Sequence, residues 1–69
     1  MKSNDYRHWQ NRKFRFNHGS FYHERFGDET ASVVRIGPVL AHYSIKGMTY
    51  SMPLQNLDPK QNVTTEVHD

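Results

Sequence analysis

The fold is decided by residues 39–53, which read VLAHYSIKGMTYSMP. Most apolar side chains in this segment alternate with polar ones, as in Ala41, Tyr43 and Ile45 against His42 and Ser44. This alternation is typical of β-strands, because successive side chains of a strand point to opposite faces. The glycine of the central Lys46-Gly47 pair fits a two-residue hairpin turn, since glycine adopts positive φ without a steric clash. We therefore predict a β-hairpin with one largely apolar face, in which the cross-strand pairs are Ile45 with Met48, Tyr43 with Tyr50, and Ala41 with Met52.

The residues on either side of this hairpin also carry strand and turn signals. Residues 32–36, SVVRI, are predicted to form a strand that is closed by Gly37-Pro38, because proline has no amide proton to donate. After the hairpin, residues 53–59, PLQNLDP, indicate one helical turn that uses Leu54 and Leu57 to close the core.

Further towards the N-terminus, residues 13–16, KFRF, alternate charge with aromatic rings and predict another strand. Residues 17–20, NHGS, are typical of a turn, from which residues 21–26 are expected to return as a strand. Gly27-Asp28-Glu29 makes the next break. Whether Phe14 and Phe16 face the core or a binding partner remains open at this stage, although core aromatic residues are the more common case.

These segments predict a mostly β fold, either a small antiparallel sheet or a five-stranded barrel like that of SH3 domains. We divide the chain into a basic-aromatic segment at residues 1–12, a small β domain at 13–59 and a flexible polar tail at 60–69. The first segment fits a short helix and a disordered arm equally well, because Asn4 and Asp5 can cap a helix start.

The order of elements over about residues 32–59 resembles the small barrel of the Tudor and KOW type. The shared features are a strand, a Gly-Pro turn, the hairpin around Lys46-Gly47, and the segment PLQNLDP. The resemblance implies a five-stranded barrel that binds RNA, peptides or components of the transcription and translation machinery.

Length and composition limit what this chain can be. A domain of 69 residues buries only about 60% of the surface that its unfolded form exposes, so its stability margin is thin. There is no cysteine, which excludes disulfides and thiolate metal sites and makes a cytoplasmic location the default expectation. Without a long apolar run we expect no membrane partner.

Charge and aromatic residues are concentrated in the first 27 positions, which hold seven of the nine aromatic residues and six of the nine Lys and Arg. These positions carry a net charge of +4, whereas residues 28–69 carry −2. Cations hold phosphates and rings stack on bases, so this mixture is typical of a surface that binds nucleic acid. We predict a binding surface, with Trp9 and Tyr22 exposed, made of Arg7, Trp9, Arg12, Lys13, Arg15, Tyr22, His23 and Arg25.

No motif indicates catalysis, and we expect the protein not to be an enzyme, to use no cofactor and to take no small-molecule substrate. His18 and His23 straddle a turn that could bring their rings together, but a structural zinc site usually needs four ligands with cysteine among them. We therefore expect no metal site. His42 lies opposite the apolar side of its strand and is expected to face solvent.

The leading functional expectation is a non-catalytic module that contacts nucleic acid, with RNA favoured, or the machinery that handles nucleic acid. The alternative is a small regulator of the phage or plasmid type that binds a host protein such as RNA polymerase and modulates transcription. In that case the same Arg and aromatic residues would meet an acidic surface of the partner. A structural subunit of a larger particle is a third possibility.

Overall fold

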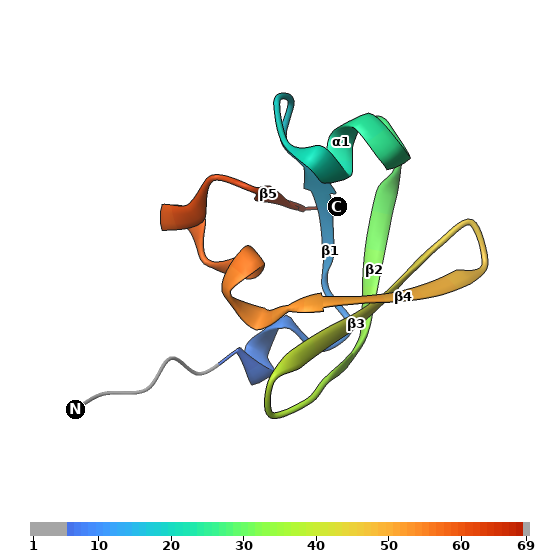
Figure 1. Ribbon diagram of the computed structural model, residues 1–69. Helices are drawn as coiled ribbons and strands as arrows, with labels where there is room; N and C mark the ends of the chain where they lie inside the picture. The colour runs from blue at the N-terminus through green and yellow to red at the C-terminus, as the bar shows by residue number, and fades with distance from the viewer. Residues whose placement is uncertain (1–5, 69) are drawn as a thin grey trace.

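A single five-stranded antiparallel sheet makes up most of the structure, a computed structural model that describes residues 6–68 (Figure 1). The strands lie in the order β4-β3-β2-β1-β5, so β4 and β5 form the two edges. The mostly β prediction is confirmed, and of its two forms the structure has the open sheet rather than the closed barrel. The strands are β1 (Lys13–Phe16), β2 (Thr30–Ile36), β3 (Leu40–Ile45), β4 (Met48–Pro53) and β5 (Thr64–Val67).

The β3–β4 hairpin has the predicted register. Ile45 pairs with Met48, Tyr43 with Tyr50 and Ala41 with Met52. Both turn residues have positive φ, 52° at Lys46 and 84° at Gly47, as a primed hairpin turn requires. Tyr43 is only 1% exposed and its ring centroid lies 5.7 Å from that of the half-buried Tyr50, so the two tyrosines are the predicted cross-strand neighbours.

The sheet changes direction within β2, where the pairing with β3 shifts register between Val33 and Arg35. Such a bulge bends the strand and increases its twist. Figure 1 shows the result, because the β3–β4 hairpin crosses β1 and β2 obliquely. The bulge also puts Val33 on the buried face and Arg35 on the exposed face, although the two residues are two positions apart.

Residues 21–26 do not form the predicted strand; they form a short helix, α1 (Phe21–Phe26). The side chain of Ser20 accepts a hydrogen bond from the backbone N–H of His23 at 3.0 Å, which caps the start of the helix. Gly27 ends the helix with φ of 69° and donates its N–H to the His23 carbonyl. Tyr22 and Phe26, four residues apart, lie on one helical face and stack on the ring of Phe16.

The segment before β1 is attached to the sheet. Arg7–Trp9 forms a 3₁₀ turn, η1, and the backbones of Asn11 and Arg12 exchange hydrogen bonds with Val33. The expectation that Trp9 is exposed is wrong: its side chain is 7% exposed and meets Phe14 edge-on. The part of the predicted arm at residues 1–5 lies outside the described residues.

Part of the predicted flexible tail is also ordered. Thr64–Val67 forms β5, which pairs with the whole of β1. The hydroxyl of the buried Thr64 donates a hydrogen bond to the Asn56 carbonyl at 2.8 Å. The predicted flexible tail at residues 60–69 is therefore wrong for Thr64–Val67, because the backbone of these residues completes one edge of the sheet. Asp69 lies outside the described residues.

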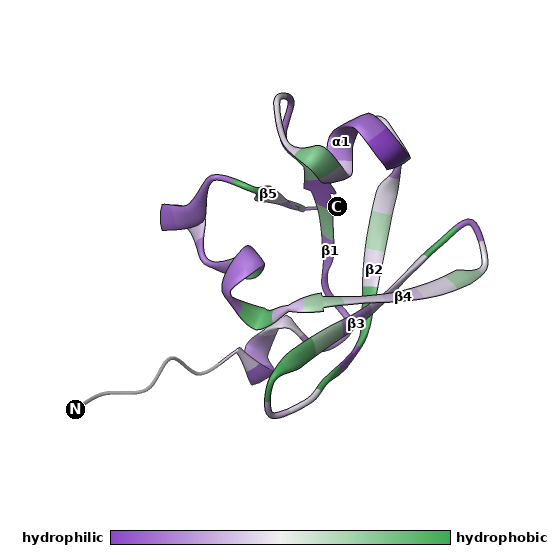
Figure 2. Cartoon of the chain, in the orientation of Figure 1, coloured by the Kyte–Doolittle hydropathy of each residue, from purple (hydrophilic) through white to green (hydrophobic). Residues whose placement is uncertain are grey.

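The core occupies one face of the bent sheet. Leu57, in the 3₁₀ turn η2 (Leu54–Leu57), is 1% exposed and Leu54 packs beside the core, as predicted, while a second turn, η3 (Pro59–Gln61), leads to β5. Figure 2 shows hydrophobic residues mainly along the strands and hydrophilic ones over most of α1 and η3. The question left open for Phe14 and Phe16 is settled, because both are buried among the core residues Trp9, Phe14, Phe16, Ala31, Val33, Ala41, Tyr43, Ile45, Met52 and Leu57. No helix within residues 6–68 has the length and apolar character needed to cross a bilayer.

Candidate nucleic-acid interface

The face of the sheet opposite the core is largely polar and spans all five strands, with the exposed apolar Leu40 and its partner Pro53 at one end. The strand pairing aligns its outward side chains in rows across the sheet. One row joins the two edges through Lys13 of β1, and a neighbouring row contains Arg35 of β2. We call this surface the outer face and define it by its outward residues, Lys13, Arg15, Thr30, Ser32, Arg35, Leu40, His42, Ser44, Thr49, Ser51, Pro53, Thr65 and Val67.

The outer face carries positive charge without a carboxylate of its own. Lys13, Arg15 and Arg35 are exposed, and in the described part of the chain no Asp or Glu occupies an outward position on a strand. His42, paired with Arg35, is half-buried and lies on this face, as predicted. Its Nδ1 is 3.1 Å from the Ser51 hydroxyl. The remaining positions are mostly hydroxyl side chains, which can donate and accept hydrogen bonds.

Beside Arg15, the outer face borders a hollow of about 200 Å³ that is lined in part by His18, Asp28 and Thr65. A hydrogen bond from His23 lowers the pKa of Asp28 below its ordinary value, and the positive charges of His18, His23 and Arg15 act in the same direction. The Asp28 carboxylate therefore lies in the same hollow as Arg15, at one end of the outer face.

The residues of the predicted binding surface do not share one face. Lys13 and Arg15 lie on the outer face, whereas Trp9 is in the core. Arg7 is exposed on η1. The Arg12 guanidinium forms an ion pair with Glu66 at 2.7 Å, so much of its charge is neutralised locally.

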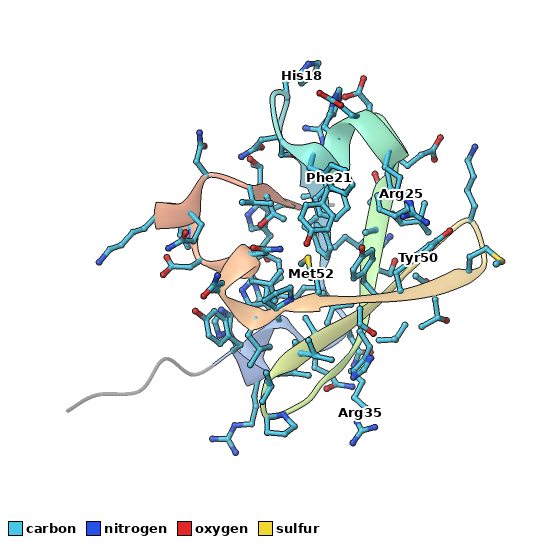
Figure 3. The ribbon with its side chains drawn as sticks, in the orientation of Figure 1. His18, Phe21, Arg25, Arg35, Tyr50 and Met52 are labelled. Atoms are coloured by element: carbon cyan, nitrogen blue, oxygen red, sulfur yellow. The ribbon has the colours of Figure 1, made fainter. Side chains whose placement is uncertain are left out.

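The three predicted residues of α1 lie on the helix that covers the core. Tyr22, which was expected to be exposed, is half-buried and stacks on Phe16, with ring centroids 4.9 Å apart. His23 is half-buried against Asp28. Arg25 is exposed, and its guanidinium lies over the rings of Phe26 and Tyr50, at 5.4 and 6.0 Å from their centroids. Figure 3 shows Arg25 beside Tyr50 on one side of the molecule and Arg35 at the far end of the sheet.

The sequence reasoning missed Arg35 as a member of the same surface as Lys13 and Arg15. The alternation in β3 and β4 correctly placed His42 and Ser51 on the polar side of the hairpin. The side of Arg35 was hidden by the β2 bulge, because an extra residue reverses the inward–outward pattern beyond it.

No protein-family model matches the chain, no curated protein is significantly similar to its sequence, and no solved structure is significantly similar to its fold.

Proposed function

We propose that the protein is a non-catalytic binding module whose outer face contacts the phosphodiester backbone of a nucleic acid, with RNA as the favoured ligand. The observation that carries this proposal is the set of exposed cations Lys13, Arg15 and Arg35 on a sheet face without an outward carboxylate in the described residues. Cations and hydroxyl groups are the side chains that most often contact phosphate oxygens and sugars.

The position of the rings determines the expected binding mode. Trp9, Phe14 and Phe16 are occupied in the core, so they are not free to stack on bases. Affinity then comes chiefly from phosphate contacts, which carry no sequence information and weaken as salt rises. We expect low sequence selectivity and strong salt dependence.

The hydroxyl side chains of the outer face favour RNA. Ser32 and Ser44 lie in the same row as Lys13, and Thr65 and Thr30 flank Arg15. Such groups can exchange hydrogen bonds with the ribose 2′-hydroxyl, the group by which proteins distinguish RNA from DNA. The resemblance of residues 32–59 to barrels of the Tudor and KOW type, some of which bind RNA, is in keeping with this choice.

The first experiment measures binding of a fluorescent single-stranded RNA by anisotropy at several salt concentrations. With three phosphate contacts, the slope of log K against log salt should be about −2. Lys13→Ala combined with Arg15→Ala should weaken binding by about tenfold per lost contact and flatten the slope by about 1.4.

Lys60→Ala is the matched control, because Lys60 is exposed on η3, away from the outer face. It should leave both the affinity and the slope close to those of the parent protein. A single Lys13→Ala variant removes the same charge as Lys60→Ala, and equal weakening by these two variants would show only non-specific attraction to a basic protein and would reject the interface.

A pull-down from lysate separates this function from the alternative of a regulator that binds a protein such as RNA polymerase. Under the proposal, nuclease treatment removes the recovered partners. The alternative predicts that one stoichiometric protein is still recovered after nuclease treatment, and that the Lys13 and Arg15 variant does not recover it. That result would show that the outer face binds an acidic protein surface instead.

A further inference from the structure

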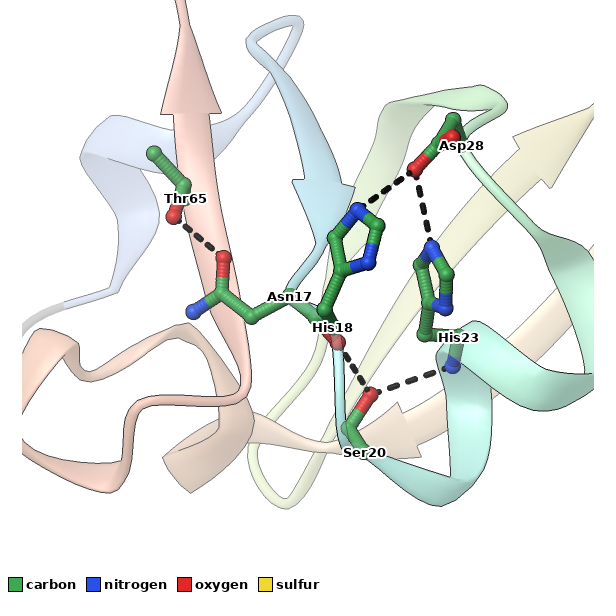
Figure 4. Close-up of polar contacts among 6 residues, drawn as sticks. All are labelled: Asn17, His18, Ser20, His23, Asp28 and Thr65. Atoms are coloured by element: carbon green, nitrogen blue, oxygen red, sulfur yellow. Dashed lines mark hydrogen bonds and ion pairs between the residues drawn. The ribbon is translucent and has the colours of Figure 1, made fainter.

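Three potential metal ligands converge at one end of the molecule, outside the outer face (Figure 4). The Nε2 atom of His23 lies 2.8 Å from Oδ1 of Asp28, and the Nε2 atom of His18 lies 3.2 Å from the same oxygen. The two imidazole rings stack with centroids 4.0 Å apart. One ligand atom from each residue lies within 4.8 Å of the other two.

Local structure explains why these residues meet. His18 lies in the turn before α1, His23 on the helix, and Asp28 in the loop that follows it. Ser20 fixes the start of the helix by accepting the His23 N–H, and Gly27 reverses the chain with a positive φ that brings Asp28 back towards both histidines. The sequence alone indicated the two histidines; the third group depends on the helix and its C-terminal turn.

The spacing of Asp28 from each histidine is close to that of neighbouring ligands around a metal ion. Ligands that each bind at about 2.0–2.1 Å around a tetrahedral centre lie about 3.3 Å from one another, close to the observed separations of His18 and His23 from Asp28. We propose that His18, His23 and Asp28 form a binding site for a divalent transition-metal ion of the zinc class. The ion would bind the two ring nitrogens that now face Asp28, and any proton that they carry would be released to solvent.

The chemistry of the donors selects this class of ion. Two imidazole nitrogens and one carboxylate suit zinc, nickel, cobalt or copper, whereas calcium and magnesium prefer shells made of oxygen ligands. Three protein ligands leave the remaining coordination positions to water. Coordination requires the two nitrogen lone pairs to converge, so the stacked rings must open. The exposed side chain of His18, 81% accessible, provides this freedom by rotation.

The site would also fasten α1 to the segments before and after it. The helix has six residues and none of them is fully buried, and it is held by Tyr22 and Phe26, which pack against the core from one side. The chain has no cysteine, and therefore no disulfide to supply such a link. An ion that binds only the folded state stabilises it, so the melting temperature should rise with zinc concentration.

The test is a zinc titration of the full chain. Calorimetry measures the binding, and NMR of the imidazole nitrogens identifies the ligands. We expect saturable binding of one ion, with shifts of the ring resonances of His18 and His23. Mutation of a residue that only hydrogen-bonds to a metal ligand typically lowers metal affinity by about 10–100-fold. Loss of a ligand itself should cost at least as much, so His18→Ala, His23→Ala and Asp28→Asn should each lower the zinc affinity by at least about tenfold.

His68→Ala is the matched control, because His68 is also an exposed histidine near a carboxylate, Glu66 at 3.9 Å, but lacks a second histidine in that pair. It should leave zinc binding unchanged. His18→Ala changes an exposed side chain and should keep the fold, which amide spectra can verify. The proposal is overturned if zinc in large excess gives no saturable binding, or if His68→Ala lowers the affinity as much as His18→Ala does.

Discussion

At the scale of single residues, Tyr43 shows how the aromatic side chains were distributed between core and surface. Its ring packs against those of Phe14, Phe16 and Tyr50, at centroid distances of 5.5, 5.7 and 5.7 Å. Edge-on and tilted contacts of this kind stabilise beyond the area that they bury. Most of the N-terminal rings therefore help to build the core on which the charged face is mounted; Phe21, which is 71% exposed, is the exception.

Burial gives Tyr43 a measurable pH effect, because it raises the pKa of the phenol to about 12. The unfolded chain ionises this group near its ordinary pKa of about 10. Between these values the unfolded state holds fewer protons, so the free energy of unfolding should fall as pH rises above 10 and be unaffected by Tyr43 below it. Urea unfolding at pH 8 and pH 11 should show a smaller loss for Tyr43→Phe than for the parent protein. An identical loss in both would contradict the assignment.

At the scale of elements, α1 is short enough to depend on its caps as well as on the packing of Tyr22 and Phe26 against the core. Ser20→Ala removes the acceptor for the His23 N–H and should lower the free energy of unfolding by about 1 kcal/mol. Ser20→Asp should restore most of that stability, since aspartate is an equally good N-cap. Thermal melts followed by circular dichroism compare the two variants. If Ser20→Asp is as destabilised as Ser20→Ala, the cap is not the cause.

The edge strand β5 gives a second prediction at this scale. Its pairing with β1 and the buried Thr64 hydroxyl tie the end of the chain to the sheet. A chain that ends at Asn62 should lose this edge, and because so small a domain has a thin stability margin, it should be largely unfolded at room temperature. In the full chain, the amide protons that β5 donates to β1 should exchange slowly. A truncated chain with native amide dispersion would show that β5 is dispensable.

Sequence patterns predicted the elements whose signals are local. The register of the β3–β4 hairpin was predicted to the residue because alternation and turn chemistry agree there. Helix α1 was missed because its six residues fit either period, and only the flanking Ser20 and Gly27 distinguish a helix. Strand β5 was missed because its polar sequence becomes a strand only through pairing with β1. The site residues followed the same rule: Lys13 and Arg15 were predicted, whereas Arg35 and Asp28 depend on a bulge and on a helix end.

At the scale of the whole molecule, the bent sheet separates two kinds of surface. The inner face, covered by α1, η1 and η2, holds the rings and aliphatic side chains, and the outer face holds exposed cations and hydroxyls. The cations of the first 27 residues therefore do not form one cluster but lie on different surfaces of the molecule. Lys13 and Arg15 join Arg35 on the outer face, whereas Arg12 is paired with Glu66 and Arg25 lies over the rings of Phe26 and Tyr50.

The most direct test of the central claim is a methyl chemical-shift map of the protein with and without a short single-stranded RNA at low salt. Methyl groups report on one face of a sheet, unlike backbone amides. The outer face should respond through Thr30, Thr65 and Val67, while Val33 and Leu57 of the core should stay unchanged. Shifts confined to α1 or to the β2–β3 turn, with the outer-face methyls silent, would contradict the account.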